Sequence, residues 1–91
     1  MELTLSNATK EGDTYYWDVP FLSYKIQSIR VVAKEFGFKV KYANGAIQYL
    51  ESGRSDDCPV IFTGRFSMFF YEDYAPPITD IEEITILLEE L

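Results

Sequence analysis

The chain has no histidine and a single cysteine, Cys58. Histidine is the commonest general base and metal ligand, so its absence excludes a Cys–His catalytic pair and a zinc site built from thiolate and imidazole ligands. The five glycines are scattered and form neither a phosphate-binding loop nor a dinucleotide-binding fingerprint. The acidic pairs Asp56–Asp57 and Glu72–Asp73 lack the alternating ligands of an EF-hand loop. We therefore expect no catalytic residue, no cofactor and no metal, and predict a protein that is not an enzyme.

Long apolar segments are also missing. No apolar run reaches the ~18 residues that a membrane-spanning helix needs. The N-terminus does not show the basic start and apolar stretch of a secretory signal. A lone cysteine cannot form an internal disulfide, which suits a reducing compartment. With 91 residues, the sequence predicts one domain (1–91) that is cytoplasmic and has no membrane partner.

Basic residues are absent from the C-terminal segment. Residues 66–91 contain seven acids and no base, whereas residues 1–65 contain eight of each, so the whole net charge of −7 arises after residue 65. Such a segment attracts basic partners and repels nucleic acid. We expect a basic protein partner and no direct nucleic-acid binding, with Lys39–Lys41 beside Tyr42 as the one exception worth testing. The alternative is an acidic surface that serves only solubility.

The first half of the chain predicts a hairpin and a helix. ELTLS near the N-terminus and TYYWDV at 14–19 are typical of strands, with KEGD between them. Asp18 can then cap a helix over about 19–36, which Gly37 would end. Its apolar residues recur at spacings of three and four: Leu22, Ile26, Ile29, Ala33 and Phe36. The dense β-branched residues of IRVVA leave a strand as the alternative.

A second hairpin is predicted around Asn44–Gly45, because both residues tolerate the positive φ of a two-residue type I′ turn. Closing the turn there pairs Tyr42 with Ile47 and Val40 with Tyr49. Residues paired in this way share a face of the sheet, so these four side chains would form one apolar side.

The remainder of the chain predicts further strands and a second helix. Residues 58–71 are apolar on both alternations around Gly64, which indicates two central strands joined at 63–65 or one bulged strand. Thr79 begins a capping-box pattern that predicts a helix over about 80–90, although ITILL also suits a strand. The expected fold class is therefore α+β: a small antiparallel β-sheet built from hairpins, packed against one central helix (about 19–36) and one C-terminal helix (about 80–90).

A candidate contact surface follows from that second helix. Ile86 would point outward, and its neighbours one turn away would all be glutamates, which resembles an interface with an apolar centre and a charged rim. The tyrosines beside Glu72–Asp73 suit an arginine-rich partner, since a guanidinium can pair with a carboxylate and stack on a ring. The predicted partner-binding residues are Tyr71, Glu72, Asp73, Tyr74, Glu82, Glu83, Ile86, Glu89 and Glu90.

These features favour an inhibitor or nucleic-acid-mimicking decoy that occupies the basic surface of a nucleic-acid-processing protein. In size, acidity and lack of catalytic groups the chain is similar to the small anti-restriction and anti-CRISPR proteins that phages encode; the likeness is one of composition and carries no residue over. The alternative is an accessory subunit or a homo-oligomeric domain, such as a homodimer, joined through apolar strands or aromatic clusters. A hydrolase that uses paired carboxylates is a remote third alternative.

Overall fold

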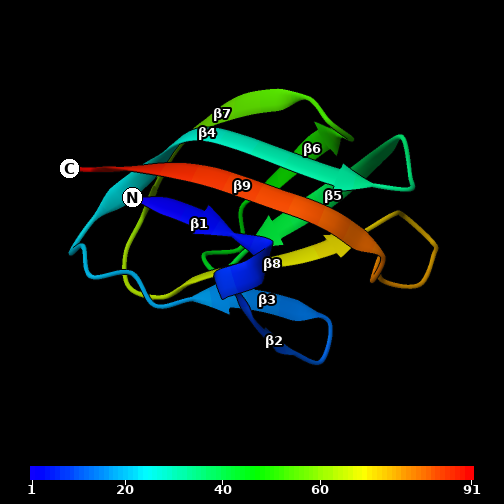
Figure 1. Ribbon diagram of the computed structural model, residues 1–91, viewed down its shortest axis with the longest axis horizontal. Helices are drawn as coiled ribbons and strands as arrows, with labels where there is room; N and C mark the ends of the chain where they lie inside the picture. Colours follow the sequence, from blue (N-terminus) through cyan, green and yellow to red (C-terminus); the bar gives the residue numbers. More distant parts are fainter.

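Two antiparallel β-sheets face each other in the computed structural model, which describes all residues from 1 to 91 (Figure 1). The four-stranded sheet A has the order β1 (Glu2–Thr4), β9 (Ile81–Glu90), β4 (Tyr24–Ala33) and β7 (Ser55–Phe62). The five-stranded sheet B has the order β2 (Thr9–Glu11), β3 (Thr14–Trp17), β8 (Phe66–Tyr71), β5 (Gly37–Tyr42) and β6 (Ile47–Glu51). One 3-10 turn, η1 (Leu5–Asn7), leads from β1 to β2. The fold contains no helical segment with the length and apolar character of a membrane span.

The core lies between the two sheets. Its 21 buried residues are all hydrophobic, and no polar or charged residue is buried with them. Aromatic rings from both sheets meet at its centre: Tyr24, Phe62 and Phe66 lie with ring centres 5.3–6.3 Å apart. The two most central tyrosines keep their hydroxyls satisfied, because Tyr24 donates to the Gly64 carbonyl at 2.6 Å and Tyr42 donates to the Gln48 side chain. Ring contacts across a sandwich of this kind add to the stability that burial provides.

The predicted central helix over 19–36 is wrong, because residues 24–33 form strand β4. Its inward side chains are buried and alternate with a period of two, except at one step of three, from Ile26 to Ile29. The register with both neighbouring strands shifts at that step, which marks a β-bulge. The extra residue at the bulge produces one spacing of three, and two ordinary steps of two add up to a spacing of four. Together these spacings resemble those of a helix. The β-branched residues indicate the true structure.

The predicted C-terminal helix over 80–90 is also wrong, because residues 81–90 form strand β9. Ile84, Ile86 and Leu88 alternate inward and are buried. β9 is paired on both sides, with β1 and with β4, so it is a central strand of sheet A. The fold class is therefore all-β with two antiparallel sheets, and the expected α+β arrangement of one sheet against two helices is corrected.

The hairpin predicted around Asn44–Gly45 is present as β5 and β6, but its predicted register is wrong by one residue. The loop contains three residues, 43–45, since the Tyr42 N–H donates to the Ala46 carbonyl at 2.9 Å. Of the two turn residues only Gly45 has a positive φ, +86°, whereas a type I′ turn needs both. A three-residue loop that ends in a left-handed glycine is the next commonest way to close a hairpin.

The extra loop residue turns the side chains of β6 to the opposite face. Lys41, and not Tyr42, lies opposite Ile47. The expected apolar side is therefore split: Val40 and Tyr42 are buried, while Ile47 and Tyr49 are each 56 % exposed on the outside of sheet B. A one-residue slip has this effect because successive side chains of a strand point to opposite faces.

The other strand predictions are partly confirmed. Residues 58–71 do contain two strands joined around Gly64, but β7 is an edge strand of sheet A and only β8 is central, in sheet B. Residues 14–17 do form a hairpin strand, β3, but its partner is 9–11. Residues 2–4 pair with β9 instead and belong to the other sheet.

Candidate functional site

Two neighbouring loops form an acidic end of the molecule. The β4–β5 turn (34–36) and the β8–β9 loop (72–80) lie at the same end of the sandwich, at the right of Figure 1. They approach each other closely, since Lys34 Nζ is 3.9 Å from Asp80 Oδ2. We define the acidic end by its five carboxylates, two lysines and two exposed rings: Glu35, Glu72, Asp73, Asp80, Glu82, Lys34, Lys39, Phe36 and Tyr74.

Tyr74 is the most unusual residue of the acidic end. Its φ of +60° makes it the one non-glycine residue with left-handed backbone, and its side chain is fully exposed. It occupies the third position of a turn in which the Ala75 N–H donates to the Glu72 carbonyl at 3.3 Å. That backbone costs a residue with a Cβ about 1–2 kcal/mol, and no burial of the ring offsets the cost. Residual strain of this type concentrates at functional sites.

Phe36 provides the second exposed ring. Its side chain is 75 % exposed, while its carbonyl accepts a 2.8 Å hydrogen bond from the Ser52 N–H, so its backbone is fixed. Beside it, one carboxylate oxygen of Glu35 is shielded from solvent and has no hydrogen-bond donor. The sequence missed both residues because it placed 34–36 within a helix. A strand that ends at Ala33 would have left residues 34–36 as a turn, in which Phe36 has no buried position.

The lysines of the acidic end neutralise only part of its charge. Lys39 makes a 2.5 Å hydrogen bond to Asp73, and this bond holds the pKa of the lysine above its ordinary value. The contact between Lys34 and Asp80 is longer, and both of its side chains are about 70 % exposed. Exposed ion pairs contribute roughly 0–1 kcal/mol each. Glu72 and Glu82 make no ion pair, so the acidic end keeps an excess of negative charge.

The structure gathers some of the predicted contact residues and separates others. Glu72, Asp73, Tyr74 and Glu82 belong to the acidic end, and Tyr71 precedes them as the last residue of β8. The remaining three glutamates lie on β9: Glu83 is 2.8 Å from Arg30, Glu89 is 3.6 Å from Lys25, and Glu90 is unpaired at the far end of the strand. Eight residues of extended chain separate Glu82 from Glu90, or ~26 Å.

Ile86 is not a contact residue. Its side chain is 0 % exposed and points into the core, so the predicted apolar centre of an interface is absent. A helix would have placed Ile86 opposite the buried stripe, whereas in a strand it lies on the same face as Ile84 and Leu88.

Aromatic rings and bases share the outer face of sheet B. Lys39 lies between Tyr71 and Tyr49 in the register, and Lys41 lies between Phe69 and Ile47. Tyr71 is followed in sequence by Glu72 and Asp73, but across the sheet its neighbour is Lys39, and the neighbour of Phe69 is Lys41. Phe69 and Tyr71 stack on each other with ring centres 5.8 Å apart, which occupies part of their surface.

Tyr42 does not belong to this face, because it is buried in the core. The expectation of a basic stretch beside Tyr42 is therefore corrected: Lys39 and Lys41 flank Phe69 and Tyr71 instead.

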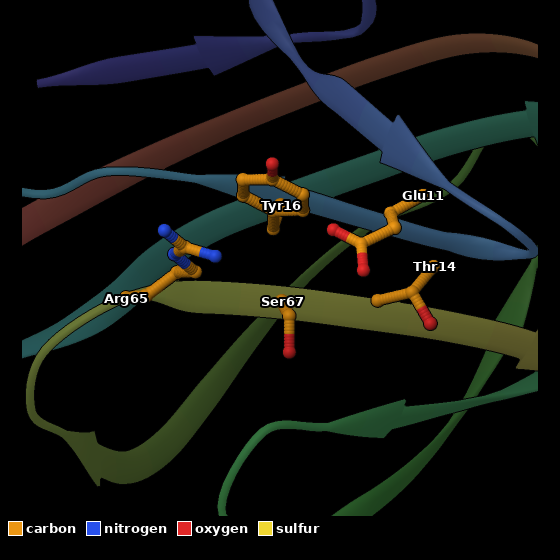
Figure 2. Close-up of a pocket in the computed structure, with 5 residues that line it drawn as sticks. All are labelled: Glu11, Thr14, Tyr16, Arg65 and Ser67. Atoms are coloured by element: carbon orange, nitrogen blue, oxygen red, sulfur yellow. The ribbon is translucent and has the colours of Figure 1, made fainter.

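A shallow hollow of about 270 Å³ lies on the same face, over β2, β3 and β8 (Figure 2). Five residues line it: Glu11, Thr14, Tyr16, Arg65 and Ser67. The Arg65 guanidinium lies 4.3 Å from the centre of the Tyr16 ring, and its Nε donates to Asp18 at 3.2 Å. Figure 2 shows Arg65 and Glu11 on opposite sides of Tyr16. Glu11 and Arg65 are therefore not arranged as a catalytic nucleophile beside a general base.

No protein-family model, no curated protein and no solved structure matches this chain.

Tyr24, Tyr42 and Cys58 are buried in the core and contribute to its packing. Burial raises the pKa of Tyr24 to about 12 and moves the pKa of Tyr42 still further in the same direction. Both hydroxyls therefore stay protonated in the core. Cys58 is buried as well, at 4 % exposure. No three His, Cys, Asp or Glu side chains are grouped closely enough to hold a metal ion.

Proposed function

We propose that this protein acts by binding, without catalysis, and that its acidic end contacts a basic surface of a partner protein. The observation that supports this most is Tyr74: a ring held fully in solvent by a strained backbone, with Glu72 and Asp73 beside it. A guanidinium can pair with a carboxylate and at the same time stack on a tyrosine ring. An arginine-rich surface therefore complements this arrangement better than a lysine-rich or apolar one.

The partner class that fits is a nucleic-acid-processing protein, whose basic groove the acidic end would occupy. This is the role of a cytoplasmic inhibitor or decoy of the anti-restriction or anti-CRISPR type. The unpaired Glu72 and Glu82 are available directly, and the weak contact between Lys34 and Asp80 can open at little cost. The proposed surface is smaller than the whole acidic C-terminal segment, because Glu83 and Glu89 are held by bases of sheet A.

We expect no direct nucleic-acid binding at the outer face of sheet B. Two of its three bases, Lys39 and Arg65, are engaged by Asp73 and Asp18. Single-strand binding needs bases that are free to follow the phosphates between the rings.

The test compares two double variants with the same net charge. Glu72→Gln with Glu82→Gln neutralises two of the three acids of the acidic end that make no ion pair, and leaves the third, the half-buried Glu35, unchanged. Glu2→Gln with Glu90→Gln neutralises two acids of sheet A that make no ion pair and lie outside the acidic end. Each immobilised protein is exposed to a bacterial lysate, and bound proteins are eluted with a salt gradient and identified. The wild type and the second variant should retain the same basic nucleic-acid-binding protein up to moderate salt, and the first variant should release it early.

Equal retention by both variants would remove the acidic end from the interaction. Retention that is unchanged between 50 mM and 500 mM salt would exclude an electrostatic contact altogether.

A second function is favoured by a different observation. Six of the eight bases are already paired with acids of the same chain, which is the pattern of a surface adapted for solubility. An accessory subunit or interaction domain would then use its apolar or aromatic surface, and neither double variant would change its binding.

A further inference from the structure

A two-sheet fold that does not close into a barrel has four edge strands, here β1, β7, β2 and β6. Each edge presents unpaired backbone N–H and C=O groups to which another strand can add. Natural proteins protect such edges by shortness, charge, proline, bulges or covering groups. Three of the four edges here are protected in these ways, and β6 is not.

The edges β1 and β2 are both short; in addition, β1 has its terminal backbone groups hydrogen-bonded, and β2 is polar. β1 has three residues, and at its end the Thr4 N–H donates to Asn7 Oδ1 at 2.9 Å while the Thr4 carbonyl accepts from Trp17 Nε1 at 3.0 Å. β2 also has three residues, Thr9–Glu11, all exposed and two of them charged.

The edge β7 is irregular. It contains Pro59, and its register with β4 shifts twice. Its Asp57 carbonyl accepts a hydrogen bond from Gln48 Nε2 at 2.8 Å, which occupies one of its polar groups. A proline, a bulge and an occupied carbonyl together make β7 a poor template for another strand.

The edge β6 has none of these devices over its first four residues, and its one charge, Glu51, lies at its end. It is five residues long, contains no proline, and presents Ile47 and Tyr49 with more than half of each side chain exposed. The hydrogen bonds that close the hairpin at both ends involve even-numbered residues, since the Ala46 carbonyl accepts from β5 and the Ser52 N–H donates to Phe36. In an antiparallel pair such bonds alternate, so the odd-numbered residues of β6 direct their backbone groups to the open side.

We propose that β6 pairs with β6 of a second copy of this chain, antiparallel across a twofold axis at Gln48. In this register Ile47 lies opposite Tyr49 of the second copy, and Tyr49 lies opposite Ile47 of the second copy. All four free N–H and C=O groups of these two residues then form hydrogen bonds, and both side-chain contacts are β-branched–aromatic pairs, which favour sheet formation. The two five-stranded sheets become one continuous sheet.

The chemistry of the edge favours a second copy as its occupant. Ile47, Gln48 and Tyr49 carry no charge, so two chains of net charge −7 meet here without facing acids. Glu51, the one acid of the strand, lies outside the paired residues and is 3.7 Å from Arg54. Its carbonyl already accepts from the Arg54 N–H at 3.1 Å, which disfavours the register centred on Tyr49, where that carbonyl would be needed.

The side chain of Gln48 does not oppose the pairing. Its carbonyl oxygen accepts from Tyr42 and its amide donates to β7, so it is held inside its own chain when two copies meet at the axis. The dimer would leave both acidic ends free, so it is independent of the proposed function, and each proposal can fail without the other.

The test uses one substitution at two edges. Ile47→Lys places a charge at the β6 edge, twice in a twofold dimer, as natural edge strands do to prevent pairing. Ile61→Lys is the matched control, because Ile61 is exposed to a similar extent, 61 %, on the edge strand β7. Sedimentation velocity of the full chain over a range of micromolar concentrations measures the dissociation constant. Amide exchange measured by NMR at low and high protein concentration locates the contact.

We expect a concentration-dependent dimer for the wild type and for Ile61→Lys, and a dissociation constant at least about tenfold higher for Ile47→Lys, since both cross-strand pairs are lost. The amides of Ile47 and Tyr49 should exchange more slowly at high concentration, while the amide of Gln48 should not change. A wild-type chain that stays monomeric overturns the proposal, even if it captures a strand of another protein. A dimer that survives Ile47→Lys, or one that Ile61→Lys disrupts equally, overturns it as well.

Discussion

Replacing Tyr74 by glycine should stabilise the protein and weaken its binding at the same time. The backbone at Tyr74 lies in the left-handed region, with φ +60°, and its ring packs against nothing. Glycine adopts this conformation without a steric penalty. The substitution therefore removes strain without removing a buried contact.

The expected gain follows from two opposing effects. Relief of the left-handed strain contributes about 1–2 kcal/mol, whereas the greater freedom of glycine in the unfolded chain costs about 0.4–1 kcal/mol. The net increase in the free energy of unfolding should be roughly 0.5–1 kcal/mol. For a domain of this size that corresponds to a rise in Tm of about 2–8 °C, measurable by calorimetry or by circular dichroism.

Tyr74→Ala separates the ring from the backbone strain. Alanine keeps a Cβ, so its Tm should stay close to that of the wild type, but it removes the ring that we propose stacks on an arginine. Both variants should therefore bind the basic partner more weakly, and only the glycine variant should be more stable. A glycine variant that is no more stable than the alanine variant would refute the strain at this turn. Unchanged partner binding by both would remove Tyr74 from the interface.

Two further predictions concern the core. The free energy of unfolding should fall as the pH rises from 10 towards 12, because the folded state raises the pKa of Tyr24 from 10.0 to about 12 and therefore binds the phenolic proton more tightly than the unfolded chain does. Chemical denaturation at a series of pH values, together with tyrosinate absorbance, measures this change. A free energy of unfolding that stays constant between pH 10 and 12 would contradict it. Ile86→Ala should lower the free energy of unfolding by about 3 kcal/mol in urea titrations, because Ile86 is completely buried. Leu87→Ala, at the neighbouring exposed position, should lower it by less than about 1 kcal/mol. Equal decreases for the two variants would contradict the inward orientation of Ile86.

The sequence predicts the positions of the secondary-structure elements better than it predicts whether each element is a helix or a strand. In β4 the apolar positions follow a period of two that one bulge interrupts, and at Ile26–Ile29 this imitates the spacing of a helix. In β9 a similar irregularity beside Ile81 has the same effect. The pattern alone does not reveal a bulge, because the bulge is set by pairing with distant strands. The β-branched residues in both segments are the local signal that favoured strands.

The register at Asn44–Gly45 could not be taken from the turn residues alone. A two-residue and a three-residue loop both use Gly45 with positive φ, and they differ by one residue in pairing. That single residue decides whether Ile47 and Tyr49 face the core or solvent. The rest of the hairpin, with both strands and the buried Val40, followed from the sequence.

The candidate site was predicted in part. Glu72, Asp73 and Tyr74 could be identified because they are adjacent in sequence and follow directly after an apolar strand. Phe36 could not be identified, because it comes from a segment 36 residues earlier that the β4–β9 and β5–β8 pairings bring to the same end. Ile86 was assigned to the wrong side of its element, since the error in secondary structure reverses its orientation.

The most direct test of the acidic end is a map of the amides that respond to a basic probe. A short arginine-rich peptide is titrated into isotopically labelled protein, and two-dimensional NMR spectra are recorded at low and at high salt. We predict that the largest shifts occur at 34–36, at 72–75 and at Glu82, and that salt suppresses them. Shifts of equal size at Glu2 and Glu90, or shifts that persist at high salt, would contradict a localised electrostatic binding site.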